Sequence, residues 1–150
     1  MSKSLGNVID PRDIIGGATL QRLQFPQGIP TCGADALRLA LLSQNCQGAE
    51  IRVDVGEVLS QRRFCNKVWN GLRFVLGVLG DLGGEFQPPH PEQVVPGGPM
   101  ERWVLSRLAG AVSECGRRLE CLEFHGALAA VQHFWLRSFC DVFLVGGTPF

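Results

Sequence analysis

Apolar residues recur at three- and four-residue steps along four stretches of the chain, which predicts four helices. The stretches cover residues 34–44, 55–79, 99–122 and 123–145. Their stripes include Leu59, Val68, Leu72 and Val75 in the second stretch, Val104, Leu108, Val112 and Leu119 in the third, and Leu128, Val131, Phe139 and Val142 in the fourth. No alternating run is long enough for a substantial sheet, so the pattern predicts an all-α helical bundle.

Each of the three longer predicted helices carries one tryptophan on its apolar stripe. These residues are Trp69, Trp103 and Trp135. A large aromatic side chain on an apolar stripe is typical of a packing face. We therefore expect the three helices to pack together, with all three tryptophans at least partly buried.

Glycine and proline cluster outside the predicted helices. Residues 1–33 are rich in both, which predicts an irregular arm with at most short strands or turns. Residues 83–99 are equally rich and have no hydrophobic period, which predicts a linker in extended conformations. Asp35 lies at the start of the first predicted helix, where it could serve as an N-terminal cap or charge.

The composition excludes some classes of partner. Hydrophobic residues make up 45% and charged residues 19% of the 150 positions, which is typical of a globular chain. The 14 basic and 14 acidic residues cancel, so total charge gives no argument for binding DNA or other nucleic acids. The longest stretch without charged residues has 13 residues, whereas a membrane helix needs roughly 20. We expect no membrane and no DNA partner.

The spacing of the cysteines and histidines predicts no metal site. No pair among the 6 cysteines has the spacing of a zinc knuckle, and the 3 histidines are scattered. Three of the cysteines fall within apolar helical stretches, where a thiol behaves as a small apolar group. We expect structural thiols in a reducing compartment and no protein-bound metal.

The long helix over residues 55–79 has a distinct polar side. At about 100° per residue, one arc collects Arg62, Asn66, Lys67, Asn70 and Arg73, and the apolar stripe takes the opposite arc. No acidic residue lies between positions 58 and 80, although four basic residues do. Such a strip can contact phosphates and base edges of RNA. The alternatives are an ordinary solvated helix face, or amides that bond a neighbouring helix and hold the bundle together.

The first eleven residues form the most specific stretch of the sequence. Ser2, Lys3 and Ser4 precede a glycine, in a segment that ends at Asp10-Pro11. A lysine ammonium between two hydroxyls on a mobile loop is suited to closing over a phosphate chain. The alternative is an initiator methionine followed by small polar residues.

The same string resembles the Lys-Met-Ser-Lys-Ser loop of class I aminoacyl-tRNA synthetases, particularly their valyl members. Four further blocks are similar to that family in the same order: residues 25–30, 32–39, 63–70 and 101–108, followed by a fifth made of residues 133–136 and 139–143. The resemblance extends from residue 1 to about 144, and the segment over 17–24 looks shortened. It implies a loop and connecting segment from the catalytic domain over residues 1–54, and a helical anticodon-binding domain over 55–150.

The resemblance also implies roles for individual residues. Lys3 would be catalytic, and Ser2, Lys3 and Ser4 would hold the phosphates of ATP, which would enter with Mg²⁺. Arg62, Asn66, Lys67, Asn70 and Arg73 would contact tRNA(Val). The family's first loop lysine would precede Met1, so we expect a truncated piece of a valine–tRNA ligase that does not activate L-valine by itself.

Details near residues 114–115 and 134–135 look closer to the mitochondrial form of the enzyme, which implies the mitochondrial matrix. A cytoplasmic parent is the alternative. A function from another class is also open: a non-catalytic helical module whose exposed apolar faces bind a protein partner.

Overall fold

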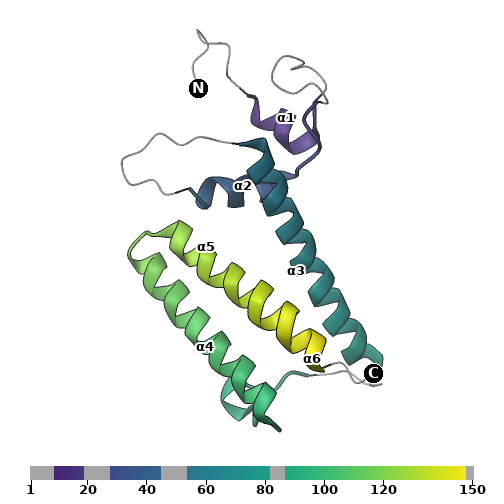
Figure 1. Cartoon of the computed structure of the whole chain (residues 1–150), viewed down its shortest axis with the longest axis vertical. Helices are drawn as coiled ribbons and strands as arrows, with labels where there is room; N and C mark the ends of the chain where they lie inside the picture. The colour runs from purple at the N-terminus through teal and green to yellow at the C-terminus, as the bar shows by residue number, and fades with distance from the viewer. Residues whose placement is uncertain (1–8, 19–27, 45–53, 82–86, 148–150) are drawn as a thin grey trace. The chain divides into compact units, whose positions relative to one another are not determined.

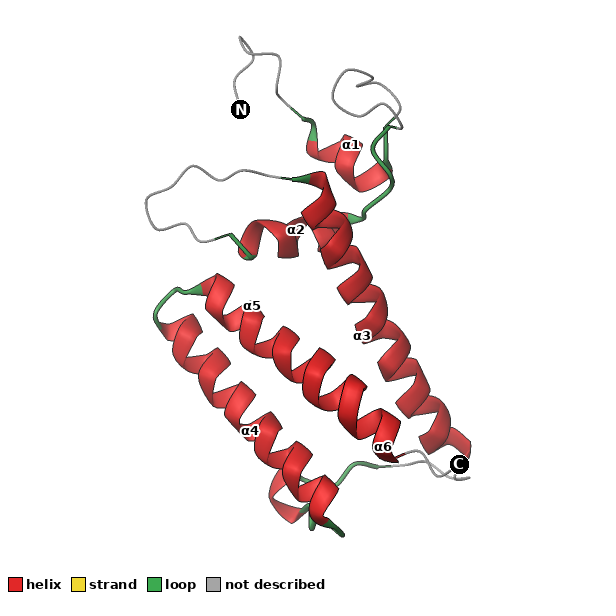
Figure 2. Cartoon of the chain, viewed as in Figure 1, coloured by secondary structure: helices red, strands yellow, loops and turns green. Residues whose placement is uncertain are grey.

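The computed structural model describes residues 9–18, 28–44, 54–81 and 87–147, and these residues are mostly helical (Figures 1 and 2). The elements are α1 (Pro11–Gly16), α2 (Ala34–Leu42), α3 (Val55–Asp81), η2 (Pro91–Gln93), α4 (Pro99–Glu120), α5 (Phe124–His133), η3 (Phe134–Leu144) and α6 (Val145–Gly147). The described residues form no sheet, which confirms the predicted all-α class.

The chain divides into two compact units, one up to Asn66 and one from Lys67 onward. The division falls within α3, so this helix contributes its first half to one unit and its second half to the other. The domain boundary expected between residues 54 and 55 rests on sequence and stays a prediction.

In the first unit, α1 is a short helix in the arm that was predicted to be irregular. Asp10 precedes it in an extended conformation, and its Oδ1 accepts a hydrogen bond from the Arg12 backbone N–H at 2.8 Å. Pro11 follows at the first helical position, where a missing N–H does no harm. The loop prediction was therefore wrong here, because Asp-Pro is a helix-start signal as well as a turn signal.

A tight turn closes α1. Gly17 has φ of 81°, and a Cβ at this position would lie 2.9 Å from Thr31 Oγ1, so only glycine fits without strain. Ala18 and Ile29 then pair as an isolated antiparallel bridge, with hydrogen bonds of 2.9 and 2.6 Å. This bridge between Ala18 and Ile29 is in line with the predicted short strands or turns.

The core of the first unit forms where α1, α2 and the start of α3 meet. Val58 of α3 is fully buried among small and branched apolar residues. The cluster comprises Ile14, Cys32, Ala36, Leu37, Ala40 and Val58. Asp35 lies in the first turn of α2, where its negative charge interacts favourably with the positive end of the helix dipole. The N-cap position belongs to Gly33, and no side chain caps the helix. The charge role is confirmed and the cap role was wrong.

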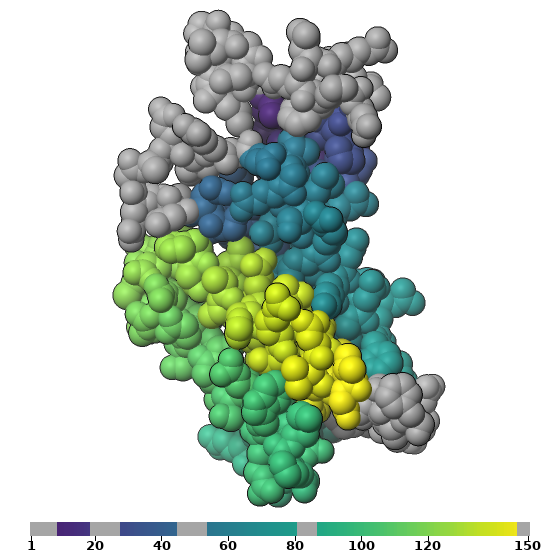
Figure 3. All heavy atoms as spheres, viewed as in Figure 1, coloured from purple at the N-terminus to yellow at the C-terminus, as the bar shows by residue number. Residues whose placement is uncertain are grey.

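In the second unit, α4 runs antiparallel to the continuous rod made of α5, η3 and α6 (Figure 1). The yellow atoms of η3 and α6 lie directly against the green atoms of α4 in the space-filling view (Figure 3). Val104 of α4, Ala127 of α5 and Ser138 of η3 are buried. Linker residues 87–98 contain one 3₁₀ turn, η2, and the backbone is extended at Val94 and Gly98.

The last predicted helix, over residues 123–145, contains an eleven-residue π-helical segment, η3. A row of aromatic rings follows this segment: Trp135 and Phe139 lie 4.9 Å apart between centroids, and Phe139 and Phe143 lie 6.0 Å apart. Apolar periodicity predicts a helix but does not separate i→i+4 from i→i+5 hydrogen bonding, so the π segment was missed.

The tryptophans differ in burial. Trp135 is half-buried, and a Cβ on Gly71 of α3 would lie 3.1 Å from its Cζ2, so glycine lets α3 approach the indole ring closely. This contact confirms the expected packing for Trp135. Trp69 is 65% exposed, which contradicts its predicted burial, and Trp103 is 37% exposed. An amphipathic stripe marks an apolar face without showing that another element covers it.

Candidate nucleic-acid interface

The loop residues Ser2, Lys3 and Ser4 lie outside the described part of the chain. Their expected contacts with ATP phosphates therefore stay predictions.

The five residues expected to contact tRNA all lie on α3, which is helical throughout this region. Arg62 and Asn66 belong to the first unit, and Lys67, Asn70 and Arg73 belong to the second. All five side chains are exposed. The helix therefore presents them to solvent, but their local partners divide them into two groups.

Arg62 and Lys67 each have a partner. The Arg62 guanidinium donates a hydrogen bond to the backbone carbonyl of Thr31, which ties α3 to the segment before α2. Lys67 Nζ lies 3.1 Å from Asp141 Oδ1 of η3, and Arg137 Nη1 lies 3.5 Å from the other carboxylate oxygen. Both roles are partly structural, so these two cations are less available to a phosphate than the sequence suggested.

Asn66, Asn70 and Arg73 are exposed and make no hydrogen bond or ion pair with any described residue. The alternative in which the two amides bond a neighbouring helix therefore has no support in this part of the structure. Their polar groups are free to bind an external ligand. The expected arc thus retains two amides and one guanidinium that bond no other residue within the described ranges.

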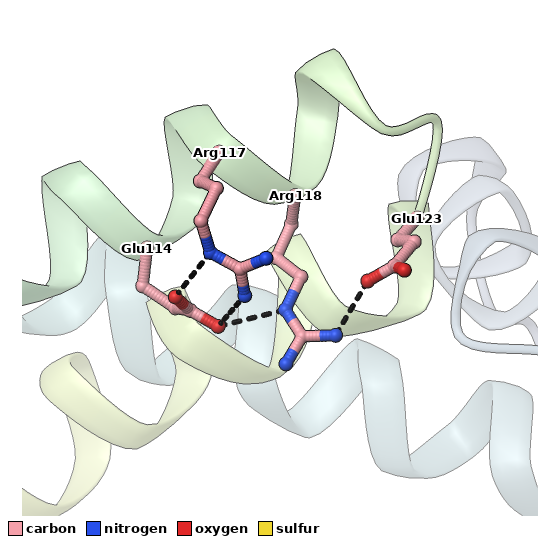
Figure 4. A network of polar contacts seen from close by, with 4 residues as sticks. All are labelled: Glu114, Arg117, Arg118 and Glu123. Carbon is pink, nitrogen blue, oxygen red and sulfur yellow. Dashed lines mark hydrogen bonds and ion pairs between the residues drawn. The ribbon is translucent and has the colours of Figure 1, made fainter.

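Charged side chains at the C-terminal end of α4 and just after it form a network of hydrogen bonds and ion pairs (Figure 4). Glu114 accepts hydrogen bonds from Arg117 Nη2 and Arg118 Nε at 2.7 Å each, and Arg118 also bonds Glu123. Hydrogen bonds from Arg117 and Arg118 lower the pKa of the Glu114 carboxyl to about 2. The two arginines are thereby neutralised, so this basic pair is a poor phosphate site. Its three- and four-residue spacing is the signal that sequence reasoning passed over.

Three cysteines, one buried and two partly buried, have thiol pKa values that their surroundings raise. Burial raises the pKa of the Cys32 thiol, which the Arg62 guanidinium opposes more weakly. Burial also raises the pKa of the Cys65 and Cys140 thiols. Such groups remain protonated at neutral pH, as expected for structural cysteines.

A pocket of about 300 Å³ lies between α4 and the α5–η3 rod. Arg107 of α4 and His133 of α5 line it, with the guanidinium Nη2 3.4 Å from the imidazole Nε2. Phe134 and Ser138 line the same pocket from η3. Sequence reasoning missed this site because it depends on the register of two helices, which no local pattern encodes.

Within the described residues, no group of three or more His, Cys, Asp or Glu side chains could hold a metal ion. None of the described helices combines the length and apolar character that a membrane crossing requires.

The family model and the similar proteins that match this chain are all tRNA synthetases. A family model described as tRNA synthetases class I (I, L, M and V) matches residues 1–54. The mitochondrial valine–tRNA ligase of Mus musculus is 47% identical, with 99% of this chain and 16% of the relative aligned. The mitochondrial enzyme of Homo sapiens is 44% identical with the same coverage. The valine–tRNA ligase of Caenorhabditis elegans is 41% identical over 96% of this chain and 16% of its own length.

The chain spans about a sixth of the length of these relatives. The alignment to the mouse protein covers 172 positions, against 150 residues here, so that relative carries residues inside the matched region that this chain lacks. No solved structure matches the chain.

Proposed function

Because this chain belongs to the class I tRNA synthetase family and aligns with valine–tRNA ligases over nearly its whole length, we propose that it is a tRNA-contacting segment of such an enzyme. The whole enzyme would activate L-valine with ATP and then transfer the valyl group to the terminus of tRNA(Val). This segment would supply the contact with the tRNA, through the polar side of α3.

One observation supports the tRNA contact most directly. Asn66, Asn70 and Arg73 are exposed and bond no residue in the described part of the chain, on a helix that carries no acidic residue between positions 58 and 80. Arg73 would bind phosphate, and the two amides would bond base edges of the anticodon, as amides do in single-stranded RNA recognition. Arg62 and Lys67 would add charge at the edge of the contact while keeping their internal partners.

The substrate ATP would be bound by Ser2, Lys3 and Ser4. In the whole enzyme, the Lys3 ammonium would oppose the negative charge that develops on the ATP phosphates during adenylate formation, with Mg²⁺ accompanying the ATP. Catalysis needs several groups held in position, so a lone loop lysine does not suffice. We expect no valine-dependent pyrophosphate exchange from this chain alone above the level of a Lys3→Ala control.

The names of the relatives support a proposal for the cell compartment. The relatives from Mus musculus and Homo sapiens that are 47% and 44% identical are named as mitochondrial enzymes, so we propose the mitochondrial matrix. A cytoplasmic parent is the alternative, because a human valine–tRNA ligase without that label is also 40% identical.

Titration of the chain with tRNA(Val) at several salt concentrations tests the proposal. Phosphate contacts make the affinity fall steeply with salt, whereas an apolar protein interface does not respond in this way. Asn66→Ala and Asn70→Ala should reduce discrimination between matched and mismatched anticodons more than they reduce overall affinity. Circular dichroism and melting curves must accompany both variants, to confirm that they fold.

The rival function, a helical module for a protein partner, also has an observation in its favour. Several large apolar side chains in the second unit are exposed, including Trp69, Leu76 and Val112. Affinity for tRNA(Val) that is absent, or that does not change with salt, would favour the rival.

A further inference from the structure

The pocket between α4 and the α5–η3 rod has the size and lining of a ligand site. Its volume of about 300 Å³ is at the lower end of the range for small-molecule pockets. Its lining residues all belong to the second unit and come from α4, α5 and η3. The pocket is distinct from the polar side of α3, because none of its lining residues lies on that helix.

A cation marks one side of the pocket. Arg107 is exposed, and no carboxylate among the described residues pairs with its guanidinium. Its neighbour is the His133 imidazole at 3.4 Å, which does not neutralise the charge. Glu114 also lines the pocket, but its two oxygens are already bonded to Arg117 and Arg118. The guanidinium of Arg107 is therefore available to an anionic group.

A serine hydroxyl lies on the floor of the pocket. Ser138 is 3% exposed, lines the pocket, and makes no hydrogen bond to any described residue. The hydroxyl can donate one hydrogen bond and accept others, so it offers a polar contact to a ligand that enters the pocket. This observation is independent of the charge on Arg107.

Phe134 supplies an apolar wall from the same side as Ser138. An aromatic ring close to hydrogen-bonding groups and a free cation suits a ligand that joins a flat heterocycle to a phosphate. We propose that this pocket binds one nucleotide, with the phosphate on Arg107 and the base against Phe134, within reach of Ser138 and His133. Where the nucleotide belongs to tRNA, the inference rests on the proposed function, but a free mononucleotide shares the same chemistry.

The test uses the full chain and three substitutions. Arg107→Gln removes the charge, Ser138→Ala removes the hydroxyl, and Arg102→Gln removes an exposed cation on the same helix outside the pocket. Adenosine and cytidine monophosphates are titrated by nuclear magnetic resonance, and tRNA(Val) by fluorescence anisotropy. Melting curves establish that each variant folds, and Ser138→Ala keeps the proposal testable if Arg107→Gln does not.

The proposal expects mononucleotide shifts at backbone amides in 106–111 and 130–138, and affinity reduced about tenfold by Arg107→Gln but unchanged by Arg102→Gln. A parallel loss of tRNA affinity in the pocket variants identifies the nucleotide as part of the RNA. Unchanged tRNA affinity identifies a free nucleotide as the ligand.

Two results separate this inference from the proposed function. If tRNA binds but no mononucleotide perturbs the pocket and neither pocket variant matters, the pocket proposal is overturned and the tRNA contact stands. If the pocket binds mononucleotides but the chain has no affinity for tRNA, the proposed function is overturned and the pocket stands.

Discussion

At the scale of single residues, Leu122 carries the most unfavourable backbone conformation in the described chain. Its φ is 59°, just after the end of α4, and the amides of Leu122 and Glu123 bond back to the carbonyls of Leu119 and Arg118. This is the hydrogen-bond pattern of a Schellman C-cap, which usually has glycine at the left-handed position. A leucine there is strained by roughly 1 kcal/mol.

Leu122→Gly should therefore stabilise the chain by up to about 1 kcal/mol. Little apolar burial is lost, because Leu122 is 73% exposed. The matched control is Leu119→Gly, inside α4, which should destabilise by about 1 kcal/mol. Chemical denaturation followed by circular dichroism measures both. Equal destabilisation by the two substitutions would show that the left-handed conformation is not a strained one.

Gly71 and Gly77 give a second matched pair, both within α3 in the second unit. Helix propensity alone favours alanine over glycine by about 1 kcal/mol at both positions. A Cβ meets nothing within 4 Å at Gly77, but lies 3.1 Å from Trp135 Cζ2 at Gly71. We expect Gly77→Ala to raise the melting temperature and Gly71→Ala to raise it less or to lower it. The same gain at both positions would contradict the contact between α3 and Trp135.

At the scale of elements, the sequence predicted the helices well where the hydrophobic period is long. The start of α3 and the start of α4 agree with prediction at Val55 and Pro99. The short helix α1 was missed because six residues are too few to show a period. The π segment was missed for a different reason, since its aromatic row satisfies either hydrogen-bonding pattern.

The ion-pair network that ends α4 predicts how stability changes with pH. The pKa of Glu114 is lowered from 4.5 to about 2 in the folded chain, chiefly by hydrogen bonds from Arg117 and Arg118. A lowered folded pKa gives stability that is present above the unfolded pKa and is lost as pH falls through the folded pKa. The Glu114 contribution should therefore disappear between about pH 4.5 and pH 2. Its size is limited by solvent screening, because the side chain is exposed to 40%.

Melting curves at pH 6, 4, 3 and 2 check this dependence. Glu114→Gln should lose less stability over the acid range than the parent chain does, because it has no carboxyl to protonate. Glu120→Gln, on the same exposed helix end, serves as the control. A Glu114→Gln variant that follows the parent curve at every pH would mean that the network contributes no stability.

At the scale of the whole molecule, the candidate site was predictable only in part. The family resemblance and the polar arc of α3 could be read locally, because both depend on residues near one another in sequence. The partners of Arg62 and Lys67 could not, because Thr31 and Asp141 lie 31 and 74 positions away. The exposure of Trp69 was missed for the same reason, since burial depends on what covers a face.

The salt dependence of tRNA(Val) binding by Arg73→Ala is the most direct test of the proposed contact between α3 and tRNA. Arg73 is the best probe of the strip, because its side chain is exposed and bonds no described residue, unlike Arg62 and Lys67. If it binds phosphate, the substitution should weaken binding and shallow the slope of log affinity against log salt by about 0.7–0.9. Arg102→Ala, on α4, should leave both quantities unchanged. If Arg73→Ala folds and binds with the affinity and slope of the parent chain, the assignment of the polar side of α3 to tRNA is wrong.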